Sequence, residues 1–161
     1  MNKTEKIFQT LDTLGITFEK LEHQPIMTMH DGEHIARQFG ITACKSLLMC
    51  NRQKRFFMIL LPESKKLSAS NVASQLNSTH LSFASPYDME RLLCASPGSV
   101  SILGLLFDTK HQIQPVIDHE ILSQPYMGCH PCVNTCSLKI KTEDILNTFI
   151  PATGHDFITV K

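Results

Sequence analysis

The chain has 161 residues, of which 15 are Lys or Arg and 15 are Asp or Glu. This length suits one hydrophobic core, so we expect residues 1–161 to form a single domain. The balanced charge excludes a global field that would pull the protein onto nucleic acid or an anionic membrane. Any contact with RNA is therefore expected to be local.

The sequence shows neither an export signal nor a membrane-spanning segment. Its first residues, MNKTEKIFQTLDTLG, are polar and amphipathic, and no apolar run approaches the roughly 20 residues of a membrane helix. We therefore expect a cytoplasmic protein with no membrane partner. In that compartment the six cysteines are expected to stay reduced.

The first part of the chain carries clear helix and strand signals. Apolar residues at helical spacing, followed by Gly15, predict a helix over residues 3–14. Alternation of apolar and polar residues predicts a half-buried strand over residues 16–23. Thr28 is expected to cap a second helix, which Gly40 ends.

The rest of the chain adds strands and helices in irregular order. The runs CKSLLMCN and RFFMILLP, separated by a polar turn, predict a hairpin of central strands. Further helices are expected at 68–77, 85–94 and 142–150, the last capped by Thr142, and further strands at 80–85, 97–108, 112–122 and 136–141. Because there is no strict strand-helix-strand alternation, we expect an α+β fold, a mixed, largely antiparallel sheet flanked by helices.

One segment, MGCHPCVNTCSLKI at residues 127–140, concentrates side chains that carry chemistry. Cys129, Cys132 and Cys136 with His130 are ligands of the kinds that zinc prefers, although structural zinc needs a further ligand pair from elsewhere. A catalytic cysteine is a second interpretation, but sequence neighbours on a strand point to opposite faces. A Cys-x-x-Cys redox pair is a third, and it lacks the strand-to-helix context that lowers a thiol pKa.

A fourth interpretation of this segment leaves its sulfur atoms out. His130, Asn134 and Thr135 offer hydrogen-bond donors and acceptors around Pro131. These groups either hold a polar part of a substrate or satisfy only the local backbone. The segment by itself leaves both outcomes open.

Two other features favour a binding site. Lys45 places an ammonium group at the rim of an apolar sheet, where it either meets a phosphate or carboxylate or extends into solvent. In PGSVS, residues 97–101, the turn at Gly98 exposes backbone N–H groups beside the hydroxyls of Ser99 and Ser101. Such a loop suits a carbonyl or a small amine, unless it is a plain turn that enters a strand.

Taken in order, these segments resemble the prolyl-tRNA editing family, also called the YbaK/aminoacyl-tRNA synthetase-associated domain. The resemblance covers nearly the whole chain and is carried by EHQPIMTMHDGEHIA, CKSLLMCNRQKRFFMILLPESKKLS, LSFASPYDMERLLCASPGSVSILGLLFD and GCHPCVNTCSLKIKTEDILNTFI. Within the family the chain is most similar to the stand-alone alanyl-tRNA(Pro) deacylases, which also pair a PGSVS loop with an HP segment followed by NT.

The resemblance implies a trans-editing hydrolase that deacylates mischarged aminoacyl-tRNA(Pro), above all Ala-tRNA(Pro), without metal or cofactor. It implies that Lys45 and His130 act at the catalytic centre, with Lys45 near the terminal adenosine. The residues that would bind the substrate are Gly98, Ser99, Val100, Ser101, Ile102, Asn134, Thr135 and Thr28. The implied partners are the acceptor end of tRNA(Pro) and prolyl-tRNA synthetase, and the oligomeric state is left open.

One position departs from the family pattern. The family loop reads Gly-x-x-x-Pro, and Ile102 stands where the proline would be. Losing the fixed φ of proline is expected to loosen the loop or to reshape the pocket. This departure motivates one alternative, a catalytically silent module that binds tRNA or a synthetase. Two further alternatives are a deacylase of Cys-tRNA(Pro) and, from the cysteine-rich segment, a zinc-binding domain.

Overall fold

The computed structural model describes residues 1–161, apart from the side chain of Met29. The helices are α1 (Lys3–Thr13), α2 (Met29–Phe39), α3 (Ala69–Gln75), α4 (Pro86–Leu93), the 3-10 helix η1 (Ile102–Phe107), α5 (His119–Leu122), and the consecutive α6 (Thr142–Asp144), π-helical η2 (Ile145–Phe149) and α7 (Ile150–Ala152). The strands are β1 (Phe18–Glu22), β2 (Cys44–Cys50), β3 (Phe56–Pro62), β4 (Ser82–Phe83), β5 (Ile113–Asp118), β6 (Tyr126–Cys129), β7 (Cys136–Lys141) and β8 (Ile158–Val160).

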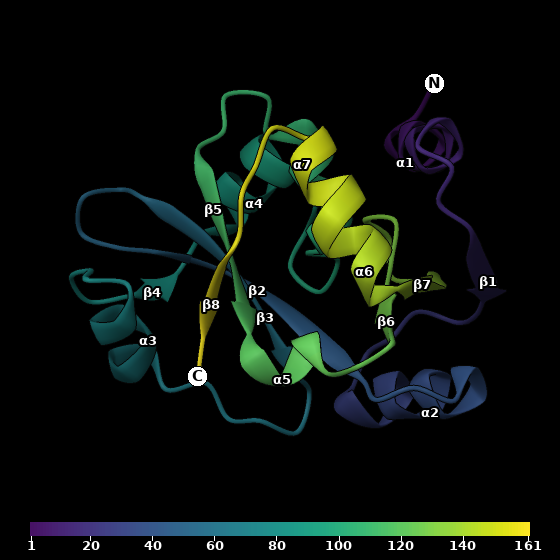
Figure 1. Ribbon diagram of the computed structural model, residues 1–161, viewed down its shortest axis with the longest axis horizontal. Helices are drawn as coiled ribbons and strands as arrows, with labels where there is room; N and C mark the ends of the chain where they lie inside the picture. The colour runs from purple at the N-terminus through teal and green to yellow at the C-terminus, as the bar shows by residue number, and fades with distance from the viewer.

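The strands form two sheets. The larger has the order β4-β2-β3-β5-β8, and the smaller has the order β1-β7-β6. Only the β3–β5 and β5–β8 pairs are parallel, so the predicted α+β fold with mixed, largely antiparallel pairing is confirmed. Figure 1 shows the C-terminal helical run in yellow beside the crossing strands of the larger sheet. No helix of the described residues is both long and apolar enough to cross a membrane.

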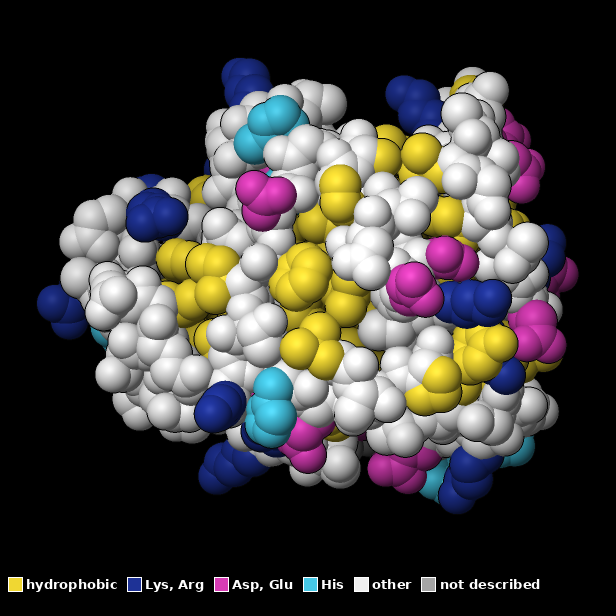
Figure 2. Space-filling model, viewed as in Figure 1, with side chains coloured by type: hydrophobic (Ala, Val, Ile, Leu, Met, Phe, Trp, Pro, Cys, Tyr) yellow, Lys and Arg dark blue, Asp and Glu magenta, His cyan; other side chains and the backbone are white. Residues whose placement is uncertain are grey.

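Strand β3 shows why the larger sheet lies at the centre of the molecule. All its residues are buried, because successive side chains alternate between two apolar layers. Phe56, Met58 and Leu60 join the main core, with residues of α1, α4, η1 and the smaller sheet. Phe57 and Ile59 face the other way, into a second cluster that α3 covers. Charged side chains of both signs are spread over the face that Figure 2 shows, as the balanced composition predicts.

Helix α2 forms as the local sequence signals predict. The Thr28 hydroxyl accepts a hydrogen bond from the backbone N–H of Asp31, whose carboxylate accepts from the N–H of Thr28. Gly40 ends the helix with φ +70°, a left-handed conformation that glycine adopts without strain. These two caps fix the direction in which the chain enters β2.

The turn predicted at the start of residues 97–108 is present, but the apolar strand predicted to follow it is wrong. Residues 97–101 form a turn and a short extended segment, and the apolar run that follows is the buried helix η1. The Ser101 hydroxyl caps η1 by accepting from the N–H of Leu103 at 3.2 Å. A Cβ at Gly104 would lie 3.3 Å from Leu93 and from Sγ of Cys132, so the helix packs closely there. A short apolar run fits a buried strand or a buried helix equally, which explains the error.

The C-terminal helix differs from its prediction at its start. Lys141 occupies the cap position without a side-chain hydrogen bond, and Thr142 is the first helical residue, with a buried hydroxyl that has no partner. The helical run continues past the predicted end to Ala152. Strands β6 and β8 were not predicted, because each is short and one of them lies in the cysteine-rich segment.

Candidate active site

A cavity of about 440 Å³ lies along the first half of β2. Its wall combines the segment before α2 and the first turn of that helix, β2, Phe83 of β4, the loop before η1, and the segment around the end of β6. Lys45 and His130 both line it, although they are far apart in the sequence. The fold therefore brings the two predicted catalytic residues to one cavity.

The cavity opens onto a free edge of the larger sheet. β3 covers one side of β2 along its whole length, whereas β4 pairs with β2 only at Met49 and Cys50. The carbonyl of Leu48 accepts from the N–H of Ala84 on the β4 side. Because backbone direction alternates along an antiparallel pair, the N–H and C=O of Ser46 also point to this outer side. Next to the cavity, that side carries no partner strand within the described chain.

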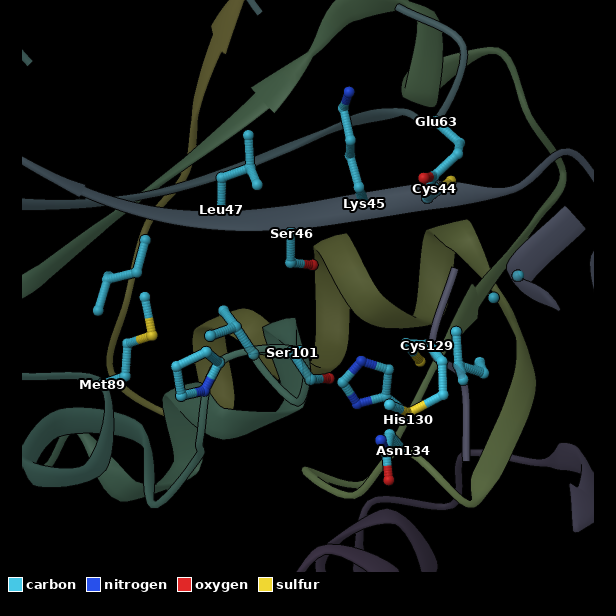
Figure 3. A pocket seen from close by; sticks show the side chains of 18 of the residues that line it. Cys44, Lys45, Ser46, Leu47, Glu63, Met89, Ser101, Cys129, His130 and Asn134 are labelled. Atoms are coloured by element: carbon cyan, nitrogen blue, oxygen red, sulfur yellow. The ribbon is translucent and has the colours of Figure 1, made fainter. Parts of the chain in front are cut away.

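Lys45 and Ser46 extend to opposite faces of β2. In Figure 3 the Lys45 side chain points away from the strand on one side, with Leu47, while Ser46 points to the other side, toward Ser101 and His130. This arrangement follows from the alternation of side chains along a strand. The cavity therefore wraps around the strand edge, with a cation on one face and hydroxyl and imidazole groups on the other.

His130 is a neutral imidazole at the cavity wall. Burial lowers its pKa to about 4, and the neighbouring His23 adds to the effect. Its Nδ1 is buried and has no hydrogen-bond partner. An unpartnered buried nitrogen costs free energy unless a ligand or water satisfies it. Nδ1 therefore has hydrogen-bonding capacity that no described group uses.

The Gly98 loop contributes only part of its predicted set. Gly98, Val100 and Ser101 line the cavity, whereas Ser99 and Ile102 do not. Gly98 has φ +88°, and the backbone N–H of Ser99 is bonded to the carbonyl of Ser96 at 2.9 Å, so that N–H is not free for a substrate. Ile102 is fully buried in the main core. The position that departs from the family pattern therefore packs beneath the loop.

Of the neighbouring residues Asn134 and Thr135, only one contributes to the cavity wall. Asn134 lines the cavity, while Thr135 is exposed and lies outside it. The carbonyl of Asn134 accepts from the N–H of Ile26 at 3.0 Å, and that of Thr135 accepts from the N–H of His23 at 2.9 Å. These bonds tie the segment after β6 to the segment before α2. The main chain of this pair is thus structural, and only the Asn134 side chain is placed to meet a ligand.

Thr28 and Glu63 occupy the rim near Lys45. Thr28 lines the cavity, but its hydroxyl already caps α2. Burial raises the pKa of the Glu63 carboxyl, an effect that nearby Lys45 opposes and Glu33 reinforces. Glu63 follows β3 directly, so the hairpin places this carboxyl and the Lys45 ammonium at the same end of the sheet.

The cysteines do not form the reactive set that the sequence left open. Burial raises the pKa of the Cys44 thiol to about 11 and that of Cys132 to about 12, and it raises the pKa of Cys129 further still. A thiol with a raised pKa is protonated at neutral pH and is a poor nucleophile. Among the described side chains, no three His, Cys, Asp or Glu residues form a group that could hold a metal ion.

Sequence reasoning missed several residues of the cavity wall, among them the apolar Met27 and Phe83. Ser46 and Glu63 line the cavity, and so does Gly32 on the first turn of α2. Ser46 carried a usable signal, because it is a polar residue between Lys45 and an otherwise apolar strand. Glu63 and Gly32 carried none, since only the folded hairpin and the docking of α2 bring them to β2.

Comparisons with known proteins agree with this architecture. The family described as the aminoacyl-tRNA editing domain matches residues 23–148. The prolyl-tRNA editing protein ProX of Acetoanaerobium sticklandii is 25% identical over 162 aligned positions, which cover 100% of this chain and 98% of that protein.

Solved structures share the fold. A protein assigned as a trans-editing enzyme for prolyl tRNA synthetase superposes with a TM-score of 0.75 at 15% identity, covering 100% of this chain and 98% of the other. The hypothetical protein APE2540 gives a TM-score of 0.74 at 18% identity, with 99% of both chains covered. Since the family match spans well over half of the sequence, the chain belongs to the aminoacyl-tRNA editing domain family.

Proposed function

We propose that this protein is a trans-editing deacylase that hydrolyses the ester of mischarged aminoacyl-tRNA(Pro), with Ala-tRNA(Pro) as its main substrate. Membership of the editing-domain family and the name of the ProX relative support the reaction class and the tRNA. The observation that carries the proposal is the cavity itself, where Lys45, His130 and the free edge of β2 at Ser46 meet.

The geometry suits hydrolysis by positioning rather than by an enzyme nucleophile. An activated ester needs a held water molecule and polarisation of its carbonyl, which fixed donors and acceptors supply. The Lys45 ammonium would hold the phosphate or sugar backbone near the terminal adenosine as a point charge. The outward N–H and C=O of Ser46 would align the aminoacyl group along the strand edge.

His130 would act without carrying a charge. With a pKa of about 4, its imidazole is neutral at physiological pH. Its Nδ1 lacks a hydrogen bond, which a bound water or the substrate amine would supply. Gly98 and Asn134 line the same cavity and would support this contact from the two neighbouring loops. The remaining predicted residues would act indirectly. They would hold the conformation of α2 and of the two loops, and they are Thr28, Ser99, Ile102 and Thr135.

A side cavity supports a small amino acid. About 80 Å³ lies beside His130, with a mainly apolar lining that includes Ile26, Gly32, Ile35 and Ala36. A pocket of this size holds a methyl group and disfavours long side chains by exclusion. Because a Cys side chain is only slightly larger than that of Ala, hydrolysis of Cys-tRNA(Pro) remains the second candidate.

The test is a deacylation panel with purified protein and Ala-, Cys- and Pro-tRNA(Pro), in which loss of the ester is followed with time. We expect Ala-tRNA(Pro) to be cleaved fastest and Pro-tRNA(Pro) to be spared, with activity lost in a Lys45→Ala variant. If the wild type cleaves no mischarged tRNA faster than this variant, the deacylase proposal fails. Binding of tRNA without turnover would instead point to a silent module.

The neutral net charge suggests how the partner is reached. With 15 basic and 15 acidic residues, affinity for the tRNA backbone is expected to be modest and confined to the acceptor end. A complex with prolyl-tRNA synthetase would supply the remaining affinity and the choice of tRNA. Addition of the synthetase to the deacylation panel should then lower the KM for the tRNA substrate.

A further inference from the structure

Phe83 is an unusually placed aromatic residue. Its side chain is 63% exposed, although it belongs to the two-residue strand β4 and lines the same cavity as Lys45. Exposed apolar residues are common as single surface features. This one borders the cavity that contains Lys45 and His130, and Met27, which is 79% exposed, lines the same cavity from the segment before α2. The wall of the cavity therefore includes two apolar side chains that are exposed to solvent, Phe83 and Met27.

The strand register places Phe83 relative to Lys45. Phe83 pairs with Met49 on β2, and directly opposed residues of an antiparallel pair project from the same face. Met49, Leu47 and Lys45 share that face, since side chains two positions apart point the same way. Met49 lies four positions after Lys45, a path of about 13 Å along the strand. Phe83 thus lies on the Lys45 side of the cavity, beyond Leu47.

Given the proposed function, on which this step rests, we infer that Phe83 is a stacking platform for a base in the unpaired 3′ strand of the tRNA, upstream of the terminal nucleotide. Proteins hold single-stranded RNA by stacking unpaired bases on exposed aromatic rings. With the terminal adenosine at Lys45, a distance of about 13 Å corresponds to about four stacked nucleotides at 3.4 Å each, and to fewer in an extended strand. An extended 3′ strand would therefore bring one of the unpaired bases before the terminal adenosine to Phe83.

Positive charge lies beyond Phe83, where the RNA strand would continue. The turn between β2 and β3 carries Arg52, Lys54 and Arg55, all exposed, and none of them forms an ion pair with a described side chain. Figure 2 shows Lys and Arg side chains at the left end of the molecule, where Figure 1 places this hairpin. A strand of RNA leaving the cavity past Phe83 would therefore approach a local cluster of cations, as a phosphate backbone requires.

A matched set of variants tests the inference. Phe83→Ala and Phe83→Leu remove the ring, Phe83→Tyr retains it, and Tyr87→Ala removes a neighbouring exposed ring that does not line the cavity. Each variant is compared on Ala-tRNA(Pro) and on alanyl-adenosine, which lacks the upstream bases. Thermal unfolding of each variant shows whether the fold is retained.

We expect Phe83→Ala to raise the KM for Ala-tRNA(Pro) roughly 5- to 150-fold, the range that loss of one stacked base implies. The loss on alanyl-adenosine should be several-fold smaller, Phe83→Tyr should restore most of the affinity, and Tyr87→Ala should match the wild type. Equal losses on both substrates, or no loss on the tRNA, would overturn the stacking role.

A binding measurement separates this inference from the proposed function. An RNA oligonucleotide that ends in CCA is titrated into the wild type and Phe83→Ala, and binding is followed by fluorescence or NMR. If the wild type hydrolyses neither substrate, the deacylase proposal fails, while weaker binding of the oligonucleotide to Phe83→Ala would still support the platform. Equal binding to both proteins would refute it.

Discussion

Lys45 and Ser46 are adjacent in the chain, yet they serve opposite faces of β2, with Ser46 on the side of His130 and Ser101. Because β4 leaves this part of β2 uncovered, a substrate lying along the strand edge would contact both side chains at once. The edge, rather than the floor of the sheet, is thus the place where the reacting group would lie.

The side chains of Lys45 and Ser46 should contribute unequally to kcat/KM. Lys45→Met removes a charged contact, so we expect kcat/KM on Ala-tRNA(Pro) to fall about 10- to 150-fold, whereas Ser46→Ala removes a neutral hydroxyl and should cost about 2- to 10-fold. Both are measured by ester loss under single-turnover and steady-state conditions. Lys45→Arg is the charge-matched control, and a larger loss in Ser46→Ala than in Lys45→Met would contradict this order.

The pKa of His130 predicts a distinct pH dependence. Because the folded pKa is about 4 and the ordinary value is 6.5, the unfolded chain binds a proton between these values that the folded protein does not. Stability should therefore rise with pH across that window, by up to about 3 kcal/mol, and be lost as the pH falls toward 4. Urea unfolding of the wild type and His130→Asn between pH 4 and 7 measures the difference.

The same pKa has a kinetic consequence. Protonation of His130 should not affect kcat/KM between pH 6 and 8, because the imidazole stays neutral there. NMR titration of the imidazole C–H signals gives the pKa directly. A measured pKa of His130 near 6.5 would contradict the proposal that burial lowers the pKa of this imidazole.

Much of the fold could be predicted because its signals are local. The caps of α2 at Thr28 and Gly40 and the continuous apolar run of β3 are patterns of neighbouring residues, and the structure contains both elements. The identity of η1 was not predictable, because its buried apolar run fits either helix or strand. Its helical form depends on close packing of Gly104 against Leu93 and Cys132, which no local pattern reports.

The site was predictable only in part, for a related reason. Lys45, Gly98 and His130 were found as separate motifs, and the structure brings all three to one cavity. The free edge of β2 depends on how short β4 is, and the small cavity beside His130 depends on the docking of α2. Such distances between elements are not encoded in spacing along the chain. The role of each of these residues stays a prediction for the assays.

Gly32 gives a direct test of the small cavity. A Cβ at this position meets no atom within 4 Å, so Gly32→Ala should fold normally and even gain about 0.5–1 kcal/mol, because alanine favours a helix. Gly32→Val should reduce the room beside His130 further. We expect both variants to lose activity on Cys-tRNA(Pro) more than on Ala-tRNA(Pro). Equal losses on the two substrates would show that the side chain of the amino acid lies elsewhere.

Asp108 and His155 should control stability far from the cavity. Their side chains are joined by a buried hydrogen bond of 2.9 Å, and the Asp108 carboxylate also accepts from the N–H groups of Gln112 and Ile113. Burial favours the protonated acid, but these hydrogen bonds outweigh it and lower the pKa of Asp108. Asp108→Ala leaves several buried donors unpaired, so we expect a loss of about 3–5 kcal/mol in the free energy of unfolding.

The matched control for this variant is Asp88→Ala. Asp88 forms a surface ion pair with Arg91 at 2.9 Å, and its loss should cost less than about 1 kcal/mol. Since the Asp108 pKa is lowered, its contribution should be present above pH 4 and fade as the pH falls through the folded value. Urea unfolding of both variants at pH 7 and at pH 3 measures these differences. Similar losses at pH 7 would contradict the structural role of Asp108.

Ile102→Pro tests whether the departure from the family loop alters catalysis or only packing. Ser101 has φ −145° and ψ 147°, the extended conformation that a following proline favours, and Ile102 begins η1, where proline is tolerated. The buried Ile102 side chain would lose apolar contacts, so we expect a loss of about 1–2 kcal/mol in stability. Because Ile102 does not line the cavity, kcat/KM on Ala-tRNA(Pro) should stay within about threefold of the wild type. Turnover that appears only in the Ile102→Pro protein would show instead that the natural chain is a silent module whose loop has lost its catalytic geometry.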